Sequence, residues 1–113
     1  MADHIDNWTI QARKGVLELA VLASLAEKQR YTYELFKLLA DVPGLNVSEG
    51  TLYPLLSRLR VQGLVKTRLE ESPEGPARKY YRLTAKGQQT LSVMQNYFDS
   101  MLSGIREIRN RKD

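Results

Sequence analysis

The side chains best suited to chemistry in this sequence are arginines and lysines that lie close to tyrosines in two short stretches. Tyr53 and Arg58 lie in one stretch, and Arg78 and Lys79 open the other, RKYYRL. Cations and hydroxyl groups of this kind bind the phosphate oxygens of nucleic acids. The formal net charge of +4 also favours an anionic partner.

The residues that enzymes and metal sites use are few. There is no cysteine, and the one histidine, His4, is close to the N-terminus. Glu70, Glu71 and Glu74 fall in a segment that has the pattern of a surface hairpin and not of a buried acidic cluster. We therefore expect no catalytic residue, no metal site and no cofactor.

The length and composition predict one small globular unit. The chain has 113 residues, of which 42% are hydrophobic and 27% charged, as is ordinary for a globular protein. No apolar run approaches the roughly 18 residues of a membrane span, and the first residues lack the pattern of a signal peptide. We expect a cytoplasmic protein.

The residues around Tyr53 have the pattern of a helix that is apolar on one side. Leucines recur at spacings of three and four residues, which places them along one side of a helix; they are Leu52, Leu55, Leu56 and Leu59. The opposite side is a ridge of small residues that includes Gly50 and Ser57, with Tyr53 and Arg58 at its margins. This shape suits a groove, so we interpret the segment as a recognition helix for DNA.

The two ends of this helix carry separate signals. Ser48 has the side chain of an N-cap, and Gly63 suits the left-handed turn that closes a helix. Pro54 leaves the Gly50 carbonyl without its usual donor if the helix begins at Ser48. Two starts are therefore open: one at Ser48 with a bend near Pro54, and one near Thr51 with proline in the first turn.

Two helices are predicted before this one and a hairpin after it. The first runs from Trp8 to Glu27 after a loose arm, Met1–Asn7, and is apolar nearly all round in its second half. The second covers Tyr31–Asp41, and its expected buried residues are Tyr33, Leu35, Phe36, Leu38 and Leu39.

The hairpin is predicted from an alternating run, Leu64–Glu70, and a β-prone run, Arg78–Leu83. In the first run Val65, Thr67 and Leu69 form the expected buried face. The intervening SPEGPA has the length of a loop and exceeds a two-residue turn. Three helices followed by a hairpin is the order of a winged helix-turn-helix, so the predicted fold class is mainly α with a small β-hairpin (α+β).

A long last helix is expected from the N-cap Thr84 to about Arg109. Its apolar residues step by three and four, the seam of a helix that packs along another helix; they are Leu91, Met94, Phe98, Met101, Ile105 and Ile108. A helix of roughly 25 residues is about 37 Å long and exceeds what the small domain can cover. We therefore predict a homodimer, in which Trp8 docks the first helix on the partner's last helix.

Four motifs, in order over most of the chain, resemble those of the PadR family of bacterial transcriptional regulators. They are KGVLELAVLASL at 14–25, YTYELFKLL at 31–39, SEGTLYPLLSRLRVQGLV at 48–65 and ESPEGPARKYYRLTAKGQQTL at 71–91. With one C-terminal helix, the chain is similar to the short subfamily. The resemblance implies a dimeric winged-helix repressor that binds a palindromic operator, with DNA affinity altered by a small effector or another signal.

The resemblance also indicates residues and a division of the chain. The implied DNA contacts are Tyr33, Ser48, Thr51, Tyr53, Arg58, Arg78 and Lys79, and Gly50 allows close approach. Residues 1–83 are expected to form the DNA-binding domain, and residues 84–113 the dimerisation helix. In some family members aromatic residues of the dimer helices line a pore for flat hydrophobic ligands; here Met94, Tyr97 and Phe98 could form such a pocket.

Simpler interpretations stay open for most of these residues. Tyr33 and Tyr53 could be half-buried core residues, Ser48 could be only a cap, and Arg58 could be exposed without a partner. The seam aromatics could be plain dimer core. The alternative function is a winged helix that binds protein and not DNA. Since no Asn or Gln points outward in mid-helix and Arg58 is the one outward guanidinium, we expect DNA shape to carry much of the selectivity.

Overall fold

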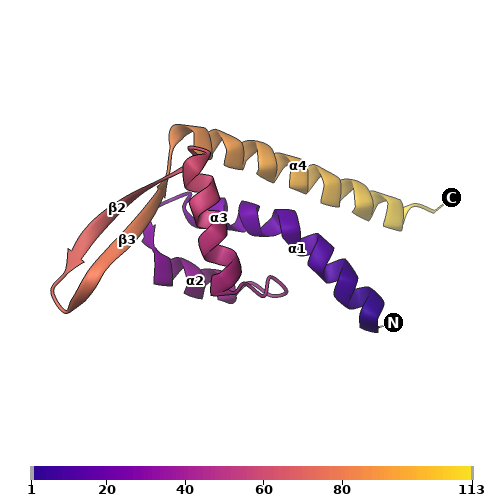
Figure 1. The fold of residues 1–113 in the computed structure, drawn as a ribbon. Helices are drawn as coiled ribbons and strands as arrows, with labels where there is room; N and C mark the ends of the chain where they lie inside the picture. Colours follow the sequence, from indigo (N-terminus) through magenta and orange to yellow (C-terminus); the bar gives the residue numbers. More distant parts are fainter. Residues whose placement is uncertain (1, 113) are drawn as a thin grey trace.

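The computed structural model describes residues 2–112, which form four helices and three strands (Figure 1). In chain order these are α1 (Ala2–Ser24), β1 (Arg30–Tyr31), α2 (Thr32–Ala40), α3 (Glu49–Val61), β2 (Val65–Ser72), β3 (Gly75–Leu83) and α4 (Ala85–Asn110). The strands form one antiparallel sheet in the order β1-β3-β2. The predicted fold class, a winged helix-turn-helix of the α+β class with a long C-terminal helix, is confirmed.

A core of leucines joins the first three helices to the base of the hairpin. Leu22, Leu35 and Leu56 are fully buried, and Val65 and Tyr81 close the core from the sheet. The apolar side predicted for α3 is confirmed, because all four of its leucines are buried. Each such leucine contributes about 2 kcal/mol through removal of its side chain from water, and this burial decides which side of α3 stays outside.

Helix α3 starts at the first of the two positions that the sequence allowed. Leu52 N–H donates to the Ser48 carbonyl at 2.9 Å, so Ser48 is the N-cap by position and Pro54 lies inside the helix. The Ser48 side chain makes no cap hydrogen bond, and its Oγ lies 3.0 Å from Thr51 Oγ1. Gly50, whose carbonyl Pro54 leaves without a helical donor, is exposed, so water can reach that oxygen.

The C-terminal end of α3 has the predicted left-handed glycine. Gly63 has φ +79°, its N–H donates to the Arg60 carbonyl at 3.0 Å, and Leu64 N–H donates to Leu59 O at 3.0 Å. This pair of hydrogen bonds is a Schellman motif. It reverses the chain and leaves the carbonyl groups after the turn facing the start of α4.

Thr84 joins the start of α4 to the end of α3. As predicted, it is the N-cap of α4: its Oγ1 accepts the Gly87 N–H at 3.0 Å. The same hydroxyl donates to the Gly63 carbonyl at 2.6 Å, and Thr84 N–H donates to the Leu64 carbonyl at 3.1 Å. One residue therefore both begins α4 and attaches it to the turn that ends α3.

Two further contacts complete this attachment. Lys86 Nζ donates to the Gln62 carbonyl at 2.9 Å. Gly87 is buried against the Leu64 carbonyl group, where no side chain fits. We call the contacts made by Thr84, Lys86 and Gly87 the α3–α4 junction.

The hairpin differs from the prediction at its tip and on one face. Ser72 pairs with Gly75, so Pro73 and Glu74 form a two-residue turn and the expected long loop is wrong. Proline suits the second position of a turn because its φ is already fixed. β3 accordingly begins three residues before Arg78. Leu69, placed on the buried face by alternation, is 71% exposed, because the hairpin extends beyond the helices that cover its base.

The predicted N-terminal arm is wrong as well, apart from Met1, which lies outside the described residues. The chain is helical from Ala2, and α1 ends at Ser24, short of the expected Glu27. Asp3 lies in the first turn, where a negative charge interacts favourably with the helix dipole. This local signal favours a helix although the segment is polar and lacks apolar periodicity.

The second helix is shorter than predicted, and its first expected residue belongs to the sheet. Tyr31 pairs with Tyr80 in β3, which makes β1 a strand that the sequence prediction missed. On α2 the expected burial of Tyr33 and Leu38 is wrong, since both are exposed, whereas Leu35 is buried.

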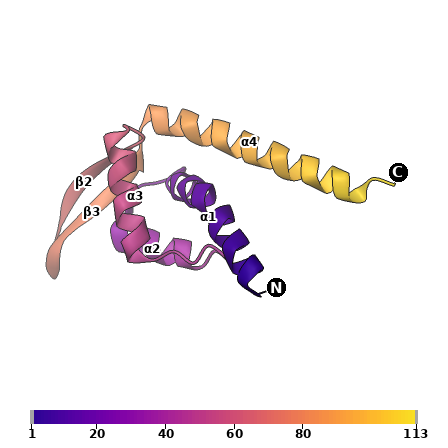
Figure 2. The same ribbon diagram turned by 45° about the vertical axis from the view of Figure 1, so that its right-hand side comes forward.

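Helix α4 extends away from the core and packs against part of α1. The two helices lie side by side near α3 and separate toward the two ends of the chain, as both views show (Figures 1 and 2). The described chain is elongated, with extents of 63 × 34 × 21 Å. Along the predicted seam of α4, exposure rises with distance from the junction: Leu91 is 9% exposed, Ile105 56% and Ile108 69%.

The α3–α4 junction predicts that Gly87 does not tolerate a side chain. A Cβ at this position would overlap the Leu64 carbonyl oxygen, and overpacking against backbone cannot be relieved by a rotamer change. We expect Gly87→Ala to lower the free energy of unfolding by about 3 kcal/mol, measured by urea denaturation followed by circular dichroism.

Gly104→Ala is the matched control in the same helix. A Cβ on Gly104 meets no atom within 4 Å, so alanine should stabilise the helix by about 0.5–1 kcal/mol. Equal urea midpoints for the two variants would contradict the close packing at Gly87.

Candidate nucleic-acid interface

A hollow of about 840 Å³ lies between the start of α2, the outer side of α3 and the hairpin. Its lining combines three tyrosines and two cationic residues with the hairpin turn, which includes Glu74. The lining residues include Tyr31, Thr32, Tyr33, Tyr53, Arg78 and Lys79, together with the hairpin turn 72–77. We call this the wing hollow. Four of the predicted contact residues line it: Tyr33, Tyr53 and Lys79, and also Arg78, whose guanidinium lies over Tyr31 on the other face of the sheet.

The two predicted contact tyrosines of the wing hollow belong to its surface. Tyr33 is 58% exposed and Tyr53 45% exposed, and neither ring belongs to the buried core. Lys37 Nζ lies 5.6 Å from the centroid of the Tyr33 ring, which adds a cation beside that hydroxyl-bearing ring. Both rings therefore form part of the surface that an incoming anion would meet.

Arg78 and Lys79, which the sequence predicts as neighbouring contacts, lie on opposite faces of the sheet. Side chains of neighbouring residues on a strand point to opposite faces. Lys79 Nζ lies 5.8 Å from the centroid of the Tyr81 ring, on the face that packs toward α3, and Arg78 lies over Tyr31 on the other face. Thr32 Oγ1 donates to the Lys79 carbonyl at 3.4 Å and so links α2 to the hairpin.

The Tyr81 ring is the buried support beneath Lys79. Burial raises the pKa of the Tyr81 phenol above its ordinary value, while the charge of Arg60 acts in the opposite direction. The phenol is therefore neutral at physiological pH, and Tyr81 serves the core while Lys79 stays exposed.

A row of aromatic rings and guanidinium groups crosses the outer face of the sheet. The Cζ of Arg78 lies 4.6 Å from the centroid of the Tyr31 ring, and Tyr31 meets Tyr80 edge to face at 5.6 Å. Arg68 continues the row at 5.1 Å from Tyr80. We call these four residues the stacked row. Sequence analysis missed all of it except Arg78.

Arg68 also neutralises an acidic residue of the hairpin. Its Nη2 lies 2.9 Å from Glu70 Oε2, and its Nε donates to Gln29 Oε1 at 3.2 Å. The charge of Glu70 is thus compensated by an arginine two positions away in the same strand.

The N-terminal end of α3 places the remaining small contact residues on the surface. Ser48, Gly50 and Thr51 are all exposed. A Cβ on Gly50 would meet only Ser48 Oγ, at 3.9 Å, so the backbone is open on that side. Free N–H groups at a helix N-terminus attract phosphate oxygens.

Arg58 has a partner that the sequence did not reveal. Its Nη2 lies 3.5 Å from Glu18 Oε2 in α1, so the interpretation of Arg58 as an exposed side chain without a partner is wrong. Arg58 borders a second hollow, of about 540 Å³, between α1 and α3. Arg13 and Lys14 of α1 line the same hollow, which makes its rim cationic.

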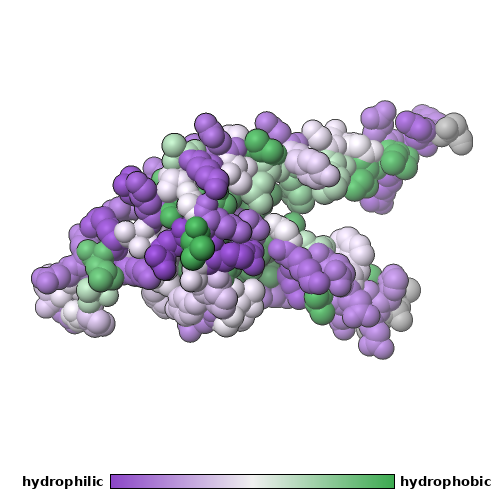
Figure 3. All heavy atoms as spheres, turned by 45° about the horizontal axis from the view of Figure 1, so that its top comes forward, coloured by the Kyte–Doolittle hydropathy of each residue, from purple (hydrophilic) through white to green (hydrophobic). Residues whose placement is uncertain are grey.

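Three residues of the predicted dimer seam, Met94, Phe98 and Met101, line a groove between α1 and α4. The groove has a volume of about 500 Å³ and is lined by Val16 and Leu19 of α1 and by Met94, Tyr97 and Phe98 of α4, among others. In the space-filling view, hydrophobic side chains of α4 face the gap that separates it from α1 (Figure 3). Trp8, on the opposite helix, is 63% exposed.

The described residues show neither a metal-binding cluster nor a membrane-spanning helix. Among residues 2–112, no group of three or more histidine, aspartate or glutamate side chains is placed to hold a metal ion. No helix of the described range is both long and apolar enough to cross a membrane.

Comparisons with known proteins agree with this geometry. Residues 21–93 match the model of the transcriptional regulator PadR-like family. The crystal structure of a PadR-like transcriptional regulator from Bacillus cereus is 33% identical, with a TM-score of 0.81 over 90% of this chain and 99% of that chain.

Two further relatives extend the comparison. A PadR family regulator from Eggerthella lenta is 32% identical, with a TM-score of 0.83 over 98% of this chain and 96% of that one. An uncharacterised protein from Lysinibacillus sphaericus is 31% identical over 83 residues, which cover 72% of this chain and 76% of that protein. The chain therefore belongs to the PadR-like family of transcriptional regulators.

Proposed function

We propose that this regulator is a DNA-binding repressor that acts in the cytoplasm and binds a palindromic operator as a homodimer. The observation that carries the proposal is the wing hollow, in which exposed tyrosines and cations from α2, α3 and the hairpin converge. A hollow lined by Tyr33, Tyr53 and Lys79 matches the curved, anionic surface of a DNA backbone. A protein partner, the alternative, would not require this concentration of phosphate-binding groups.

In this proposal the phosphate contacts surround α3. Tyr33, Tyr53 and Lys79 contact one strand from the wing hollow, and Arg78 reaches the backbone from the other face of the hairpin. Ser48 and Thr51 bind phosphate at the N-terminus of α3, where backbone N–H groups point outward. These contacts position the protein and are insensitive to base sequence.

Base selection has few candidates on the exposed side of α3. Val61 is 78% exposed and can meet a thymine methyl group. Gly50 lets the helix backbone approach the groove, and Arg58 can reach a guanine if its contact with Glu18 opens. Selectivity then depends largely on groove shape and DNA deformability.

The homodimer forms through α4. Met101, Ile105 and Ile108 are exposed apolar residues on one side of this helix, and a second copy is the partner that covers them most simply, because the surface is then self-complementary across a two-fold axis. Residues 84–113 serve dimerisation and residues 1–83 serve DNA binding. Two α3 helices should then meet half-sites about 34 Å apart or a multiple of it.

An effector site is a further part of the proposal. The groove lined by Met94, Tyr97 and Phe98 is apolar and suits a flat hydrophobic molecule. The same residues can instead pack against the partner as plain dimer core.

DNA binding is tested with a fragment of the promoter of the protein's own gene. The logarithm of the binding constant should fall linearly with the logarithm of salt concentration, by about 0.9 for each phosphate neutralised. Fluorescence anisotropy at several salt concentrations gives this slope. A flat response, or no binding at low salt, would contradict the proposed function.

The proposed hairpin contacts predict that Arg78→Ala and Lys79→Ala each weaken binding to all DNA sequences. Each should reduce the salt slope by about 0.9, because each removes one phosphate contact. Arg82→Ala is the matched control: Arg82 lies in the same strand but pairs with Lys66 at the base of the hairpin. If Arg82→Ala lowers the slope as much as the other two, binding depends on net charge and not on the positions of Arg78 and Lys79.

The dimer is tested at Ile105, which is 56% exposed. Ile105→Glu should dissociate the dimer, because a charge cannot be buried in an apolar seam without a large cost. Phe98→Glu should have the same effect but can also disturb the fold, since Phe98 packs against the core of its own chain. Ser103→Glu adds the same charge to the opposite side of α4 and should leave the dimer intact in sedimentation velocity.

A further inference from the structure

We propose that Tyr31 is a positioning residue for Arg78. Its ring, fixed at the start of α2, holds the guanidinium of Arg78 where that group meets a DNA phosphate. The proposal rests on the proposed function and specifies how one contact of the hairpin is formed. Tyr31 makes this contribution through Arg78 and does not itself need to touch DNA.

The contact between the two side chains leaves the hydrogen-bonding groups of Arg78 available. The Cζ of Arg78 lies 4.6 Å from the centroid of the Tyr31 ring. A cation–π contact is made by the charge of the guanidinium and does not use its N–H groups as donors to oxygen. Arg78 is exposed, so those N–H groups can form hydrogen bonds with phosphate oxygens while the stack persists.

The acidic residue closest in register is occupied by another arginine. Glu70 lies directly opposite Arg78 in the β2–β3 pairing, and such cross-strand neighbours usually interact. The carboxylate of Glu70 instead contacts Arg68 at 2.9 Å. Among the ion pairs of residues 2–112, none involves Arg78. The Tyr31 ring is therefore the contact that restrains this guanidinium, and its charge stays uncompensated.

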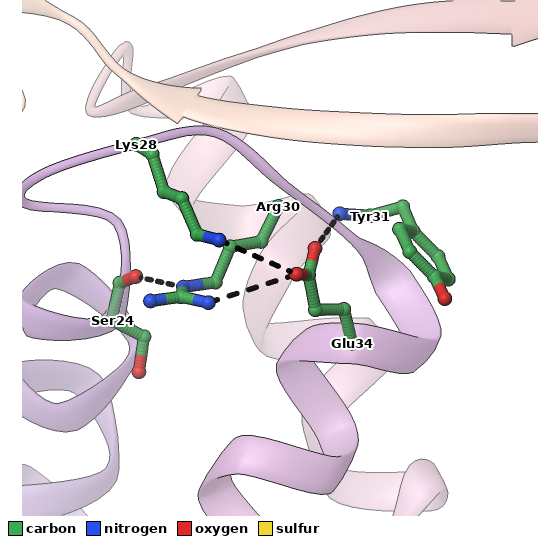
Figure 4. A network of polar contacts seen from close by, with 5 residues as sticks. All are labelled: Ser24, Lys28, Arg30, Tyr31 and Glu34. Carbon is green, nitrogen blue, oxygen red and sulfur yellow. Dashed lines mark hydrogen bonds and ion pairs between the residues drawn. The ribbon is translucent and has the colours of Figure 1, made fainter.

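Tyr31 is itself fixed by a polar network at the end of α1 (Figure 4). Its N–H donates to Glu34 Oε1 at 3.2 Å, and Glu34 Oε2 lies 3.7 Å from Arg30 Nη1. The Nε of Arg30 donates to the Ser24 carbonyl at 2.6 Å, and Lys28 adds a longer ion pair to Glu34 at 3.9 Å. The backbone of Tyr31 is thus attached to the last turn of α1 and the first turn of α2.

The sheet holds Tyr31 from its other side. Tyr31 pairs with Tyr80 across β1 and β3 and meets its ring edge to face. The Tyr31 ring is therefore held by the α1–α2 connection and by Tyr80 of β3, and not by the hairpin tip. An arginine held on a fixed ring loses less conformational freedom when it binds phosphate than one that is free to move.

The test is a double-mutant cycle with Tyr31→Leu and Arg78→Ala, measured by anisotropy on a short mixed-sequence duplex at low salt. Phosphate contacts are independent of sequence, so this duplex suffices. We expect Tyr31→Leu to weaken binding about five-fold, in keeping with a partly exposed cation–π contact. In the Arg78→Ala background Tyr31→Leu should change nothing. Tyr31→Phe keeps the ring and should bind as the unmodified protein does.

Two results would overturn the inference. Equal losses from Tyr31→Leu with and without Arg78 would show that Tyr31 supports the fold or binds DNA on its own. A loss from Tyr31→Phe as large as that from Tyr31→Leu would assign the contact to the Tyr31 hydroxyl. If the unmodified protein does not bind the duplex at low salt, the proposed function fails, which is a separate outcome.

Arg78→Lys provides a test that does not alter Tyr31 if Tyr31→Leu does not fold. Lysine keeps the charge but lacks the planar group that stacks and presents several N–H donors. We expect weaker binding with a similar salt slope. Unchanged affinity for Arg78→Lys would overturn the inference, because a positioned guanidinium would then be unnecessary.

Discussion

The carbonyl oxygen of Leu64 accepts the backbone N–H of Thr84 at 3.1 Å, and this contact determines where α4 begins and how it leaves the core. The hydroxyl of Thr84 and the ammonium of Lys86 take the two preceding carbonyl groups. Gly87 allows α4 to approach this turn more closely than a residue with a side chain could. Because the contacts are short and involve backbone on one or both sides, α3 and α4 have a defined relative orientation. The proposed DNA surface on α3 and the proposed dimer surface on α4 therefore have a fixed position relative to each other.

The positive charge that the hairpin exposes depends on which of its arginines form ion pairs, and not only on how many charged residues it has. The sequence shows acidic and basic residues in near balance there, which argues against binding through charge alone. In the structure Arg68 takes up the charge of Glu70, while Arg78 lies on an aromatic ring. An aromatic support fixes a cation without neutralising it, whereas a carboxylate would do both. The hairpin can therefore present positive charge at its edge although its net charge is small.

The features predicted correctly from the sequence are those with local signals. The leucine spacing of α3, the left-handed Gly63 and the N-cap Thr84 depend on neighbours within a few residues, and each is confirmed. The pairing of Tyr31 with Tyr80 depends on a strand of two residues and a partner about fifty positions away, for which no periodicity exists. The stacked row was missed for that reason. The two prolines of SPEGPA predict a loop by composition, whereas Pro73 occupies a tight turn between Ser72 and Gly75.

The length of α4 has a mechanical consequence that follows from the α3–α4 junction. A helix of 26 residues extends about 39 Å from its attachment. Rotation of α4 by about 5° at its attached end would move its far end by about 3 Å. Conversely, a displacement of the distal turns by about 3 Å would rotate α3 by only about 5°. In a two-fold dimer, a change of packing at the distal end of α4 would therefore produce a small change in the spacing between the two α3 helices.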